Sequence, residues 1–360
     1  MKILVLQDYL RSGGTERQSI LLANAFARAG HFVELLTFRP GGALSNTVAA
    51  TVVCTALQPF DTRLDWFAPR LYRKIRTATP DVILCMGRMA NCYAGGLQER
   101  FPSANVIATM RTGKKLPRLF RRSLGIVRHI VANSHDAQKT LEKEYGVPGE
   151  RISVIHNSLV FQTAHAPDLR ETTRVAHGAG TGTSVLLCVA MFRPEKKQRE
   201  LVEICAKLPP TLDWQLWLAG DGSARSGCER LAAERKLGAR VKFLGWQRDP
   251  SALYAAADIA VHASSSEALS NFLIEAQAAG LPMIAYDAQG IAECCSPGET
   301  GFVIPRGDAH AFSSKITELA GANATERERR AEKARAYARE NFDYENQVAR
   351  YLQLFAKLRK

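Results

Sequence analysis

Several features that would place this chain in a special class are missing from its sequence. Its longest apolar run is Val185–Phe192, which falls far short of the roughly 20 residues that a transmembrane helix needs. Its 26 glycines and 15 prolines follow no period, which excludes collagen and low-complexity repeats. The remaining class is an ordinary globular protein, and 360 residues suggest two domains of roughly 150–200 residues each.

The eight cysteines show neither a CxxC pair nor the spacing of metal ligands. Cys294 and Cys295 are adjacent and the others are scattered through apolar stretches, a pattern typical of reduced, buried thiols in a cytosolic protein. The N-terminal run 1–6 meets Asp8 and then a glycine pair, which favours a strand over a signal peptide. We therefore expect the protein to stay in the cytoplasm.

Positive charge dominates only the first half of the chain. The net charge is +13; residues 1–160 hold 22 Lys and Arg against 11 Asp and Glu, and residues 161–360 hold 26 against 24. The surplus is thus +11 in the first half and +2 in the second. We therefore expect the domain formed by the first half to carry a positively charged face. Such a face could bind nucleic acid, a phosphorylated small molecule or an anionic membrane surface.

Short apolar runs alternate with amphipathic stretches in two successive series. The runs that predict strands are Lys2–Leu6, Phe32–Leu36, Val82–Cys85, Val106–Thr109 and His129–Ala132, then Ser184–Ala190, Gln215–Ala219, Val241–Leu244, Ile259–His262 and Met283–Ala285. Ser19–Ala29 predicts a helix, and Glu326–Lys360 is helical almost throughout. This alternation predicts an α/β protein with two Rossmann-like domains, whose parallel sheets are covered on both faces. Residues 161–183, with little apolar periodicity, suggest a linker.

Gly13 and Gly14 stand between the first predicted strand and helix. Paired glycines there let backbone N–H groups approach a phosphate at a helix N-terminus, although a plain tight turn explains them equally well. The dinucleotide fingerprint G-x-G-x-x-G is absent, which argues against an NAD enzyme.

Two further segments carry charged groups directly after predicted strands. In Glu267–Glu275, two carboxylates flank a small polar stretch that opens a helix, where Ser270 and Asn271 offer backbone N–H groups to an anion. In the basic loop Met191–Lys197, Arg193 and Lys196 suit a diphosphate. The alternatives are a capped helix with a surface glutamate at each end, and a solvated basic turn.

In this order and at these spacings, the segments resemble the GT-B glycosyltransferases, and within them the retaining family GT4, which uses nucleotide-sugar donors. The most specific signature is the E-x7-E run from Glu267 to Glu275. Other matching segments are Leu218–Gly222, Val241–Gly245, Tyr254–Ile259 and, less tightly, Gly13–Arg17 and the stretch from Val131 to Asn157. The resemblance covers nearly the whole chain and is denser in the second half.

The resemblance implies a GT-B fold, with two parallel-sheet domains facing each other across a cleft. Residues 1–160 would form the acceptor-binding domain and residues 184–338 the nucleotide-sugar domain. Residues 339–360 would form a C-terminal helix that packs back on the first domain.

The resemblance also assigns roles at the donor site. Glu275 would hold the ribose hydroxyls and Glu267 the hydroxyls of the transferred sugar, while Lys196 matches the phosphate-binding lysine of the family. The resemblance also implies further donor-binding residues. Backbone N–H groups would bind the diphosphate at Gly13, Gly14, Ser270, Asn271 and Phe272, and the nucleobase would lie against the turn formed by Gly245, Trp246 and Gln247.

This chain departs from the family pattern at three places. An arginine often follows a glycine at the start of the basic loop, but Met191 stands here, and Arg193 is close enough to replace that arginine. Many members carry histidine near Arg111, and Asn157-Ser158 stands where Asn-Gly is usual. The predicted catalytic set is therefore Glu267, Lys196, Arg193 and Arg111.

No Asp-x-Asp pair occurs, so the usual metal-binding motif of metal-dependent sugar transferases is missing and no metal cofactor is expected. Arg193, Lys196 and a helix N-terminus would neutralise the leaving phosphate instead. The predicted activity is transfer of a hexose or N-acetylhexosamine from a UDP-linked donor, with GDP as the alternative nucleotide.

Two basic stretches lie in the predicted acceptor domain. Residues 111–124 carry six cations, no acid and four interleaved apolar residues, and Arg63–Arg76 mixes five cations with aromatic residues. The cations predicted to face a membrane or an anionic acceptor are Lys114, Lys115, Arg118, Arg121 and Arg122. Two other interpretations of these stretches are possible. The apolar residues could belong to the core while the charges are merely solvated, or the stretches could form a nucleic-acid groove, although no nucleic-acid-binding motif is present.

The sequence as a whole predicts a transferase at the inner face of the cell membrane, with a saccharide or lipid-linked acceptor in envelope polysaccharide or lipopolysaccharide assembly. Two alternatives stay open. A nucleotide-sugar epimerase of GT-B architecture would convert the donor without an acceptor, and a non-enzymatic basic peripheral membrane protein would do neither.

Overall fold

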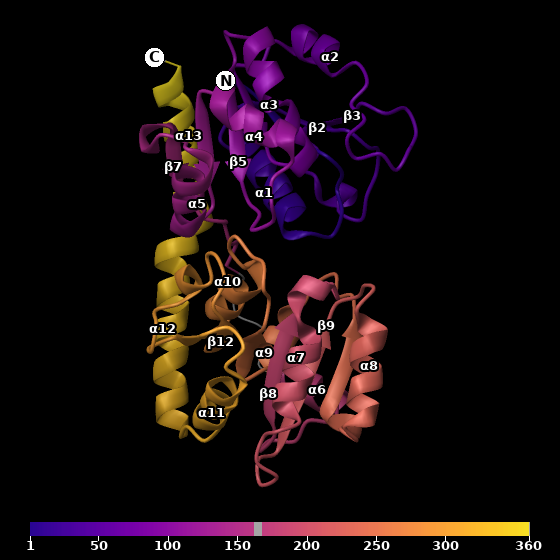
Figure 1. The fold of residues 1–360 in the computed structure, drawn as a ribbon, viewed down its shortest axis with the longest axis vertical. Coiled ribbons are helices and arrows are strands. Elements are labelled where there is room, and N and C mark those ends of the chain that lie inside the picture. Colours follow the sequence, from indigo (N-terminus) through magenta and orange to yellow (C-terminus); the bar gives the residue numbers. More distant parts are fainter. Residues whose placement is uncertain (162–167, 360) are drawn as a thin grey trace. The chain divides into compact units, whose positions relative to one another are not determined.

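The computed structural model describes residues 1–161 and 168–359, and the chain divides into two compact units (Figure 1). The first unit comprises Met1–Ser158 together with the chain from Tyr344 onward, and the second comprises Leu159–Asp343. Each unit is a parallel β-sheet with helices on both faces, which confirms the α/β class and the two Rossmann-like sheets.

The first unit has seven parallel strands in the order β3-β2-β1-β4-β5-β6-β7. The strands are β1 (Lys2–Gln7), β2 (Phe32–Thr37), β3 (Val53–Ala56), β4 (Val82–Cys85), β5 (Asn105–Met110), β6 (His129–Ala132) and β7 (Ile152–Val154). The helices are α1 (Gly14–Arg28), α2 (Leu71–Ala78), α3 (Arg88–Arg100), α4 (Arg118–Ile126), α5 (His135–Tyr145) and α13 (Tyr344–Leu358), with short 3-10 turns η1 (Ser45–Thr47) and η2 (Gly149–Arg151).

The second unit has six parallel strands in the order β10-β9-β8-β11-β12-β13. The strands are β8 (Ser184–Val189), β9 (Trp214–Ala219), β10 (Val241–Gly245), β11 (Ile259–His262), β12 (Met283–Tyr286) and β13 (Gly301–Ile304). The helices are α6 (Leu169–Ala176), α7 (Gln198–Cys205), α8 (Arg225–Glu234), α9 (Ser251–Ala256), α10 (Asn271–Ala278), α11 (Ala309–Ala320) and α12 (Ala324–Phe342), with 3-10 turns η3 (Pro194–Lys196), η4 (Gly238–Arg240) and η5 (Ala292–Cys294).

The central strands read as continuous apolar runs because both of their faces are buried. Every residue of β4, β5, β6, β9, β11 and β12 is buried, and each sheet is sandwiched between two apolar clusters. In the first unit, α13 completes one of these clusters, because Phe26 of α1 packs edge-on against Tyr351 and Phe355, with ring centroids 6.1 and 5.4 Å apart. The last helix is therefore part of the core of the first unit.

Each sheet reverses its strand order beside its first strand, between β1 and β4 and between β8 and β11. In open α/β sheets, the loops after the carboxyl ends of the two strands run in opposite directions at such a point. The crevice between these loops is a common ligand-binding site. The topology therefore marks one candidate location in each unit, after β1 in the first and after β8 and β11 in the second.

The structure differs from the sequence-based expectations in three respects. Strands β3, β7 and β13 were not predicted, because each has four residues or fewer and none is buried throughout. Part of the expected linker 161–183 is helix α6, which belongs to the second unit, while residues 162–167 lie outside the described part of the chain. The C-terminal helical stretch is two helices, α12 and α13, which are separated at Asp343.

Helix α6 escaped prediction because polar bonds rather than an apolar stripe hold it in place. The buried Arg174 guanidinium donates to Ala256 O (2.9 Å), Gly180 O (2.7 Å) and the Asp258 carboxylate (3.1 Å). These bonds fasten α6 beside the end of α9, where hydrophobic periodicity gives no signal.

The cysteines follow the expected pattern. All eight are free thiols, and six are buried, whereas Cys92 is half-buried and Cys54 is exposed. Among the helices that the structure describes, none combines the length and the apolar character that a membrane span requires.

Candidate functional site

At the carboxyl edge of the second sheet, the loops after β8 and β11 bring a cation and a carboxylate together. Glu267 Oε1 accepts hydrogen bonds from Lys196 Nζ and from His262 Nε2, the latter at 2.8 Å. The backbone N–H and the hydroxyl of Ser265 both donate to Glu195 O, at 2.8 and 3.1 Å, and so fasten the two loops to each other. Two of the predicted site residues, Lys196 and Glu267, thus meet at the point where the strand order reverses.

The Glu267 carboxylate is largely buried, with 10% of its side chain exposed. Burial raises its pKa, but the charge of Lys196 and the hydrogen bond from His262 outweigh burial and bring the pKa down to about 2. At neutral pH the group is therefore a fixed anion, which can accept hydrogen bonds from hydroxyl groups and cannot serve as a general acid.

His262 was not among the predicted site residues. It is the last residue of β11 and is 2% exposed, so its ring is fixed by the core, and its Nδ1 has no hydrogen-bond partner among the described residues. The available signal was its place at the end of the predicted strand Ile259–His262, five residues before Glu267.

The loop after β9 requires two glycines because it presses against the basic loop. Gly220 and Gly222 have φ values of 142° and 145°. A Cβ on Gly220 would lie 2.0 Å from Ala190 O, and one on Gly222 would lie 2.4 Å from Phe192 O. The segment Leu218–Gly222 therefore sets the position of the loop that carries Lys196.

Helix α10 presents the second carboxylate of the E-x7-E run. Glu275 lies in its second turn and accepts a hydrogen bond from the Tyr254 hydroxyl at 2.6 Å. The Tyr254 ring stacks on Phe272, with centroids 6.2 Å apart and planes inclined by 21°. Ser270 is buried and occupies the N-cap position, so the positive end of α10 lies in the same loop as Glu267.

The remaining predicted donor residues follow β10 and β8. Gly245 ends β10 with φ 69°, the Gln247 side chain donates to Leu244 O at 2.7 Å, and Trp246 is 43% exposed. An exposed indole at a strand's carboxyl end offers a flat surface to a nucleobase. The Arg193 side chain is exposed and makes no side-chain hydrogen bond or ion pair within the described part of the chain.

In the first unit, the glycine pair forms the start of α1 after β1. Gly13 is the N-cap residue and its carbonyl accepts from Arg17 N at 3.1 Å. Nearby in sequence, Asp8 is buried and accepts backbone N–H bonds from Met89 (2.9 Å) and Ala90 (2.7 Å) at the start of α3. Burial raises the pKa of Asp8 to about 6 despite these two bonds. Asp8 was not predicted as a site residue, although an acid between a strand and a glycine pair was a visible signal.

Arg111 lies at the end of β5 and joins segments that are far apart in sequence. Its guanidinium donates to Asn157 Oδ1 at 2.5 Å and to the Tyr351 hydroxyl of α13 at 2.7 Å. The residue predicted as catalytic thus also ties β5 to the last helix of its own unit.

The basic stretch of residues 111–124 presents charge without a continuous apolar surface. Leu116, Phe120 and Leu124 are buried in the core, whereas Leu119 is 62% exposed. All five predicted membrane-facing cations are exposed: Lys114, Lys115, Arg118, Arg121 and Arg122. For three of the four interleaved apolar residues, the core interpretation is therefore correct.

The loop before α2 is different, because its large apolar side chains are exposed. Phe60 is 69% exposed, Trp66 57%, Leu64 41% and Phe67 38%. The Tyr93 hydroxyl of α3 donates to Trp66 O at 2.6 Å and so joins this loop to the helix that packs on α4. Aromatic side chains and cations therefore share one side of the first unit.

Comparison with known proteins agrees with this fold. The model of glycosyl transferases group 1 matches residues 170–338, and the model of glycosyltransferase family 4 matches residues 12–159. The crystal structure of Anabaena HepE in complex with UDP superposes with a TM-score of 0.84 at 22% identity, over 99% of this chain and 100% of that one. WaaG, a glycosyltransferase involved in lipopolysaccharide biosynthesis, superposes with a TM-score of 0.76 at 19% identity, over 99% of each chain.

These likenesses define a protein with the two-domain GT-B fold, as the sequence predicted. The chain belongs to the group 1 glycosyl transferases of glycosyltransferase family 4.

Among curated relatives, the lipopolysaccharide core biosynthesis glycosyltransferase LpsE of Rhizobium meliloti is 34% identical over 172 residues, which are 48% of this chain and 49% of that protein. The N-acetyl-alpha-D-glucosaminyl L-malate synthase of Bacillus anthracis is 27% identical over 204 residues, 57% of this chain and 53% of that protein. The chain thus spans about half the length of the curated relatives it matches.

Proposed function

We propose that this protein is a retaining glycosyltransferase that moves a hexose or N-acetylhexosamine from a UDP-linked donor to a saccharide or lipid-linked acceptor. The observation that carries this proposal is the meeting of Lys196 and Glu267 beside the start of α10. A cation, a fixed carboxylate and a positive helix end are the groups that a sugar diphosphate requires. Membership of family 4 supports the same activity.

The donor would lie along the carboxyl edge of the second sheet. Glu275 accepts from the ribose hydroxyls, Glu267 accepts from hydroxyls of the sugar, and the exposed Trp246 faces the nucleobase. Lys196 has three N–H donors, so it can hold Glu267 and a phosphate oxygen together. The HepE complexes with UDP and UDP-glucose support UDP as the nucleotide.

The chemistry follows from where charge develops. As the bond between the anomeric carbon and the diphosphate oxygen breaks, the sugar becomes positive and the leaving phosphate gains negative charge. Lys196, Arg193 and the start of α10 stabilise that negative charge without a metal. The acceptor oxygen bonds to the anomeric carbon on the same face, and its proton passes to the leaving phosphate oxygen. The products are a glycoside and a nucleoside diphosphate.

The first test is a thermal-shift screen of UDP- and GDP-linked sugars, followed by assays of nucleoside diphosphate release. A ligand at 100 times its dissociation constant stabilises a protein by roughly 2.7 kcal/mol, which is readily seen. Turnover that needs an acceptor supports the transferase, and conversion of the donor alone supports the epimerase. A protein that binds no nucleotide sugar would leave the non-enzymatic alternative.

For the acceptor, we propose a lipid-linked or phosphorylated saccharide at an anionic membrane surface. The support is the exposed aromatic loop Phe60–Phe67 and the exposed cations of α4 on the first unit. Interfacial aromatic rings and basic side chains, at roughly 1 kcal/mol per Lys or Arg, are what such a surface attracts. The lipopolysaccharide function in the name of LpsE supports an envelope acceptor.

Liposome co-sedimentation tests the membrane proposal. Anionic vesicles should bind the protein at low salt and release part of it at physiological salt. Binding should weaken both in Lys114/Lys115/Arg121/Arg122→Ala and in Phe60→Ser/Trp66→Ser. A matched control is Phe32→Ser, because Phe32 is also 57% exposed but lies at the start of β2. No binding at low salt would refute the membrane surface and favour a water-soluble phosphorylated acceptor.

A further inference from the structure

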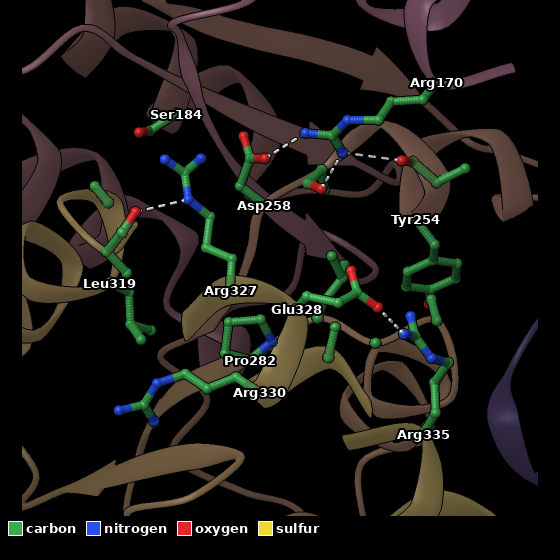
Figure 2. A pocket seen from close by; sticks show the side chains of 18 residues that line it. Arg170, Ser184, Tyr254, Asp258, Pro282, Leu319, Arg327, Glu328, Arg330 and Arg335 are labelled. Atoms are coloured by element: carbon green, nitrogen blue, oxygen red, sulfur yellow. Dashed lines mark hydrogen bonds and ion pairs between the residues drawn. The ribbon is translucent and has the colours of Figure 1, made fainter. Parts of the chain in front are cut away.

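The second unit has a cavity at the sheet edge opposite the one that carries Glu267. Its volume is about 340 Å³, and its lining includes Ser184, Asp258 and Pro282 (Figure 2). Ser184 begins β8, while Asp258 and Pro282 directly precede β11 and β12, so the cavity lies at the amino ends of the strands. The donor residues Lys196 and Glu267 follow the carboxyl ends, so the cavity is separate from the donor site.

The walls of this cavity carry more positive than negative charge. Four arginines line it, against Asp258 and Glu328. Arg170 is paired with Asp258 at 2.5 Å and Arg335 with Glu328 at 2.6 Å. Arg330 is paired with Glu326 at 2.7 Å, which leaves the Arg327 guanidinium without a carboxylate partner among the residues that the structure describes. An uncompensated guanidinium in a concave site favours an anion such as a phosphate monoester.

Arg327 is the guanidinium available to such an anion. Its Nε donates to Ala322 O at 2.8 Å, and it makes no ion pair with any residue that the structure describes. Its two terminal nitrogens point toward Ser184 in Figure 2. The two terminal nitrogens of a planar guanidinium can bind two phosphate oxygens at once.

The floor of the cavity is built from small and apolar residues. It is made by the turn between α10 and β12, which includes Gly280 and Pro282, and by alanines from α9 and α12. Gly280 has φ 88°, and a Cβ there would lie 2.5 Å from Arg335 Nη1. A larger residue at this position would therefore strain the backbone and displace the Arg335 side chain. The volume suits a sugar phosphate, because small-ligand sites occupy about 300–1,000 Å³, and the apolar residues of the floor can pack against a sugar ring next to the phosphate.

One residue joins this cavity to the donor site. Tyr254 lines the cavity, while its hydroxyl donates to Glu275 at 2.6 Å and its ring stacks on Phe272. A ligand that contacts the Tyr254 ring therefore acts on the side chain that holds Glu275 in place. Tyr254 is 6% exposed, so its position is set by packing and a shift of the ring reaches Glu275 directly.

We propose that this cavity binds a hexose phosphate and that the bound ligand changes the affinity of the donor site through Tyr254. The proposed binding of the hexose phosphate depends only on the cavity. The proposed coupling to the donor site also rests on the proposed function, because it assumes that Glu275 binds the donor. Because coupling between two binding sites is reciprocal, the donor nucleotide must change the affinity for the hexose phosphate by the same factor.

Calorimetric titration of the full chain with glucose 6-phosphate and with inorganic phosphate tests the binding. We expect one site, with glucose 6-phosphate bound more tightly than phosphate, because the floor contacts only the sugar. Arg327→Ala should weaken binding about tenfold or more. Arg329→Ala is the matched control, since Arg329 lies on the same helix, is paired with Glu326 and does not line the cavity.

Lys196→Ala separates the two sites, because it removes a phosphate-binding group of the donor site and should leave glucose 6-phosphate binding unchanged. Absence of binding, equal binding to Arg327→Ala, or loss of binding in Lys196→Ala would each overturn the proposed cavity site.

The coupling is measured as the affinity for UDP with and without saturating glucose 6-phosphate. We expect a change of about fivefold or more, equal in both directions of titration. Tyr254→Phe should keep glucose 6-phosphate binding and lose the coupling. An unchanged UDP affinity with glucose 6-phosphate bound would overturn the regulatory role. If UDP does not bind at all, the proposed donor site fails, and the calorimetric test of the cavity is unaffected.

Discussion

The pair Lys196–Glu267 should be far more strongly coupled than a surface ion pair. Glu267 has its pKa lowered to about 2, from 4.5 in an unfolded chain, which corresponds to a stabilising contribution of about 3 kcal/mol at neutral pH. Because the folded-state pKa is depressed, this contribution is complete above the unfolded pKa and is lost as the pH falls toward 2. About 2 kcal/mol of it should disappear between pH 6 and pH 3.

The assay is a double-mutant cycle with Lys196→Met, Glu267→Gln and the double variant, using urea unfolding at pH 7 and at pH 3. Removing one partner leaves the other buried charge less compensated, so we expect a coupling energy of about 1–3 kcal/mol at pH 7. That energy should decrease clearly at pH 3, where the unfolded glutamate is protonated.

The matched control is the exposed pair Lys315–Glu318, whose side chains are 34% and 46% exposed. A surface pair of this kind should give a coupling energy of less than about 1 kcal/mol at both pH values. If the Lys196–Glu267 cycle gives no more than this control, or does not depend on pH, the assignment of Glu267 as a fixed buried anion is wrong.

Three further predictions concern the donor site. Glu275→Ala should weaken UDP binding by tenfold or more in calorimetry, because two charge-assisted hydrogen bonds of about 1.5–3 kcal/mol each are lost, and an unchanged affinity would remove Glu275 from the ribose site. Treatment with EDTA should leave the rate of UDP release unchanged, so a full loss of activity would reveal a metal requirement. Gly220→Ala should lower the free energy of unfolding by about 2–4 kcal/mol, because the new Cβ would lie 2.0 Å from Ala190 O. Gly227→Ala within α8 should be neutral or stabilising, because its Cβ would meet only the end of the Arg230 side chain at 4.0 Å.

The basic stretch of residues 111–124 illustrates how composition can mislead about a surface. Cations interleaved with leucines and a phenylalanine resemble a membrane-binding helix. Helix α4, however, turns Phe120 and Leu124 toward the core and leaves only Leu119 exposed. Trp66 and Phe67 are exposed instead in the second basic stretch, Arg63–Arg76, and the exposed Phe60 lies just before it in the loop that precedes α2.

Local patterns alone were sufficient to predict the α/β class, most strands and the E-x7-E segment. A strand that is buried on both faces needs an apolar run, and a helix that begins just after such a strand needs small polar residues at its start. Both patterns lie in consecutive residues, so they can be recognised without the tertiary structure. The short edge strands β3, β7 and β13 and the polar-anchored helix α6 carry no such pattern, because neighbouring segments hold them.

The contacts that give the site its chemistry join residues far apart along the chain, and only folding brings them together. Lys196 meets Glu267 across 71 positions, and Arg111 meets Tyr351 across 240. The ionised state of Glu267 and the raised pKa of Asp8 likewise depend on burial and on neighbours from other loops. Residue types and their spacing could be read along the chain, but protonation states and hydrogen-bond partners are properties of three-dimensional surroundings.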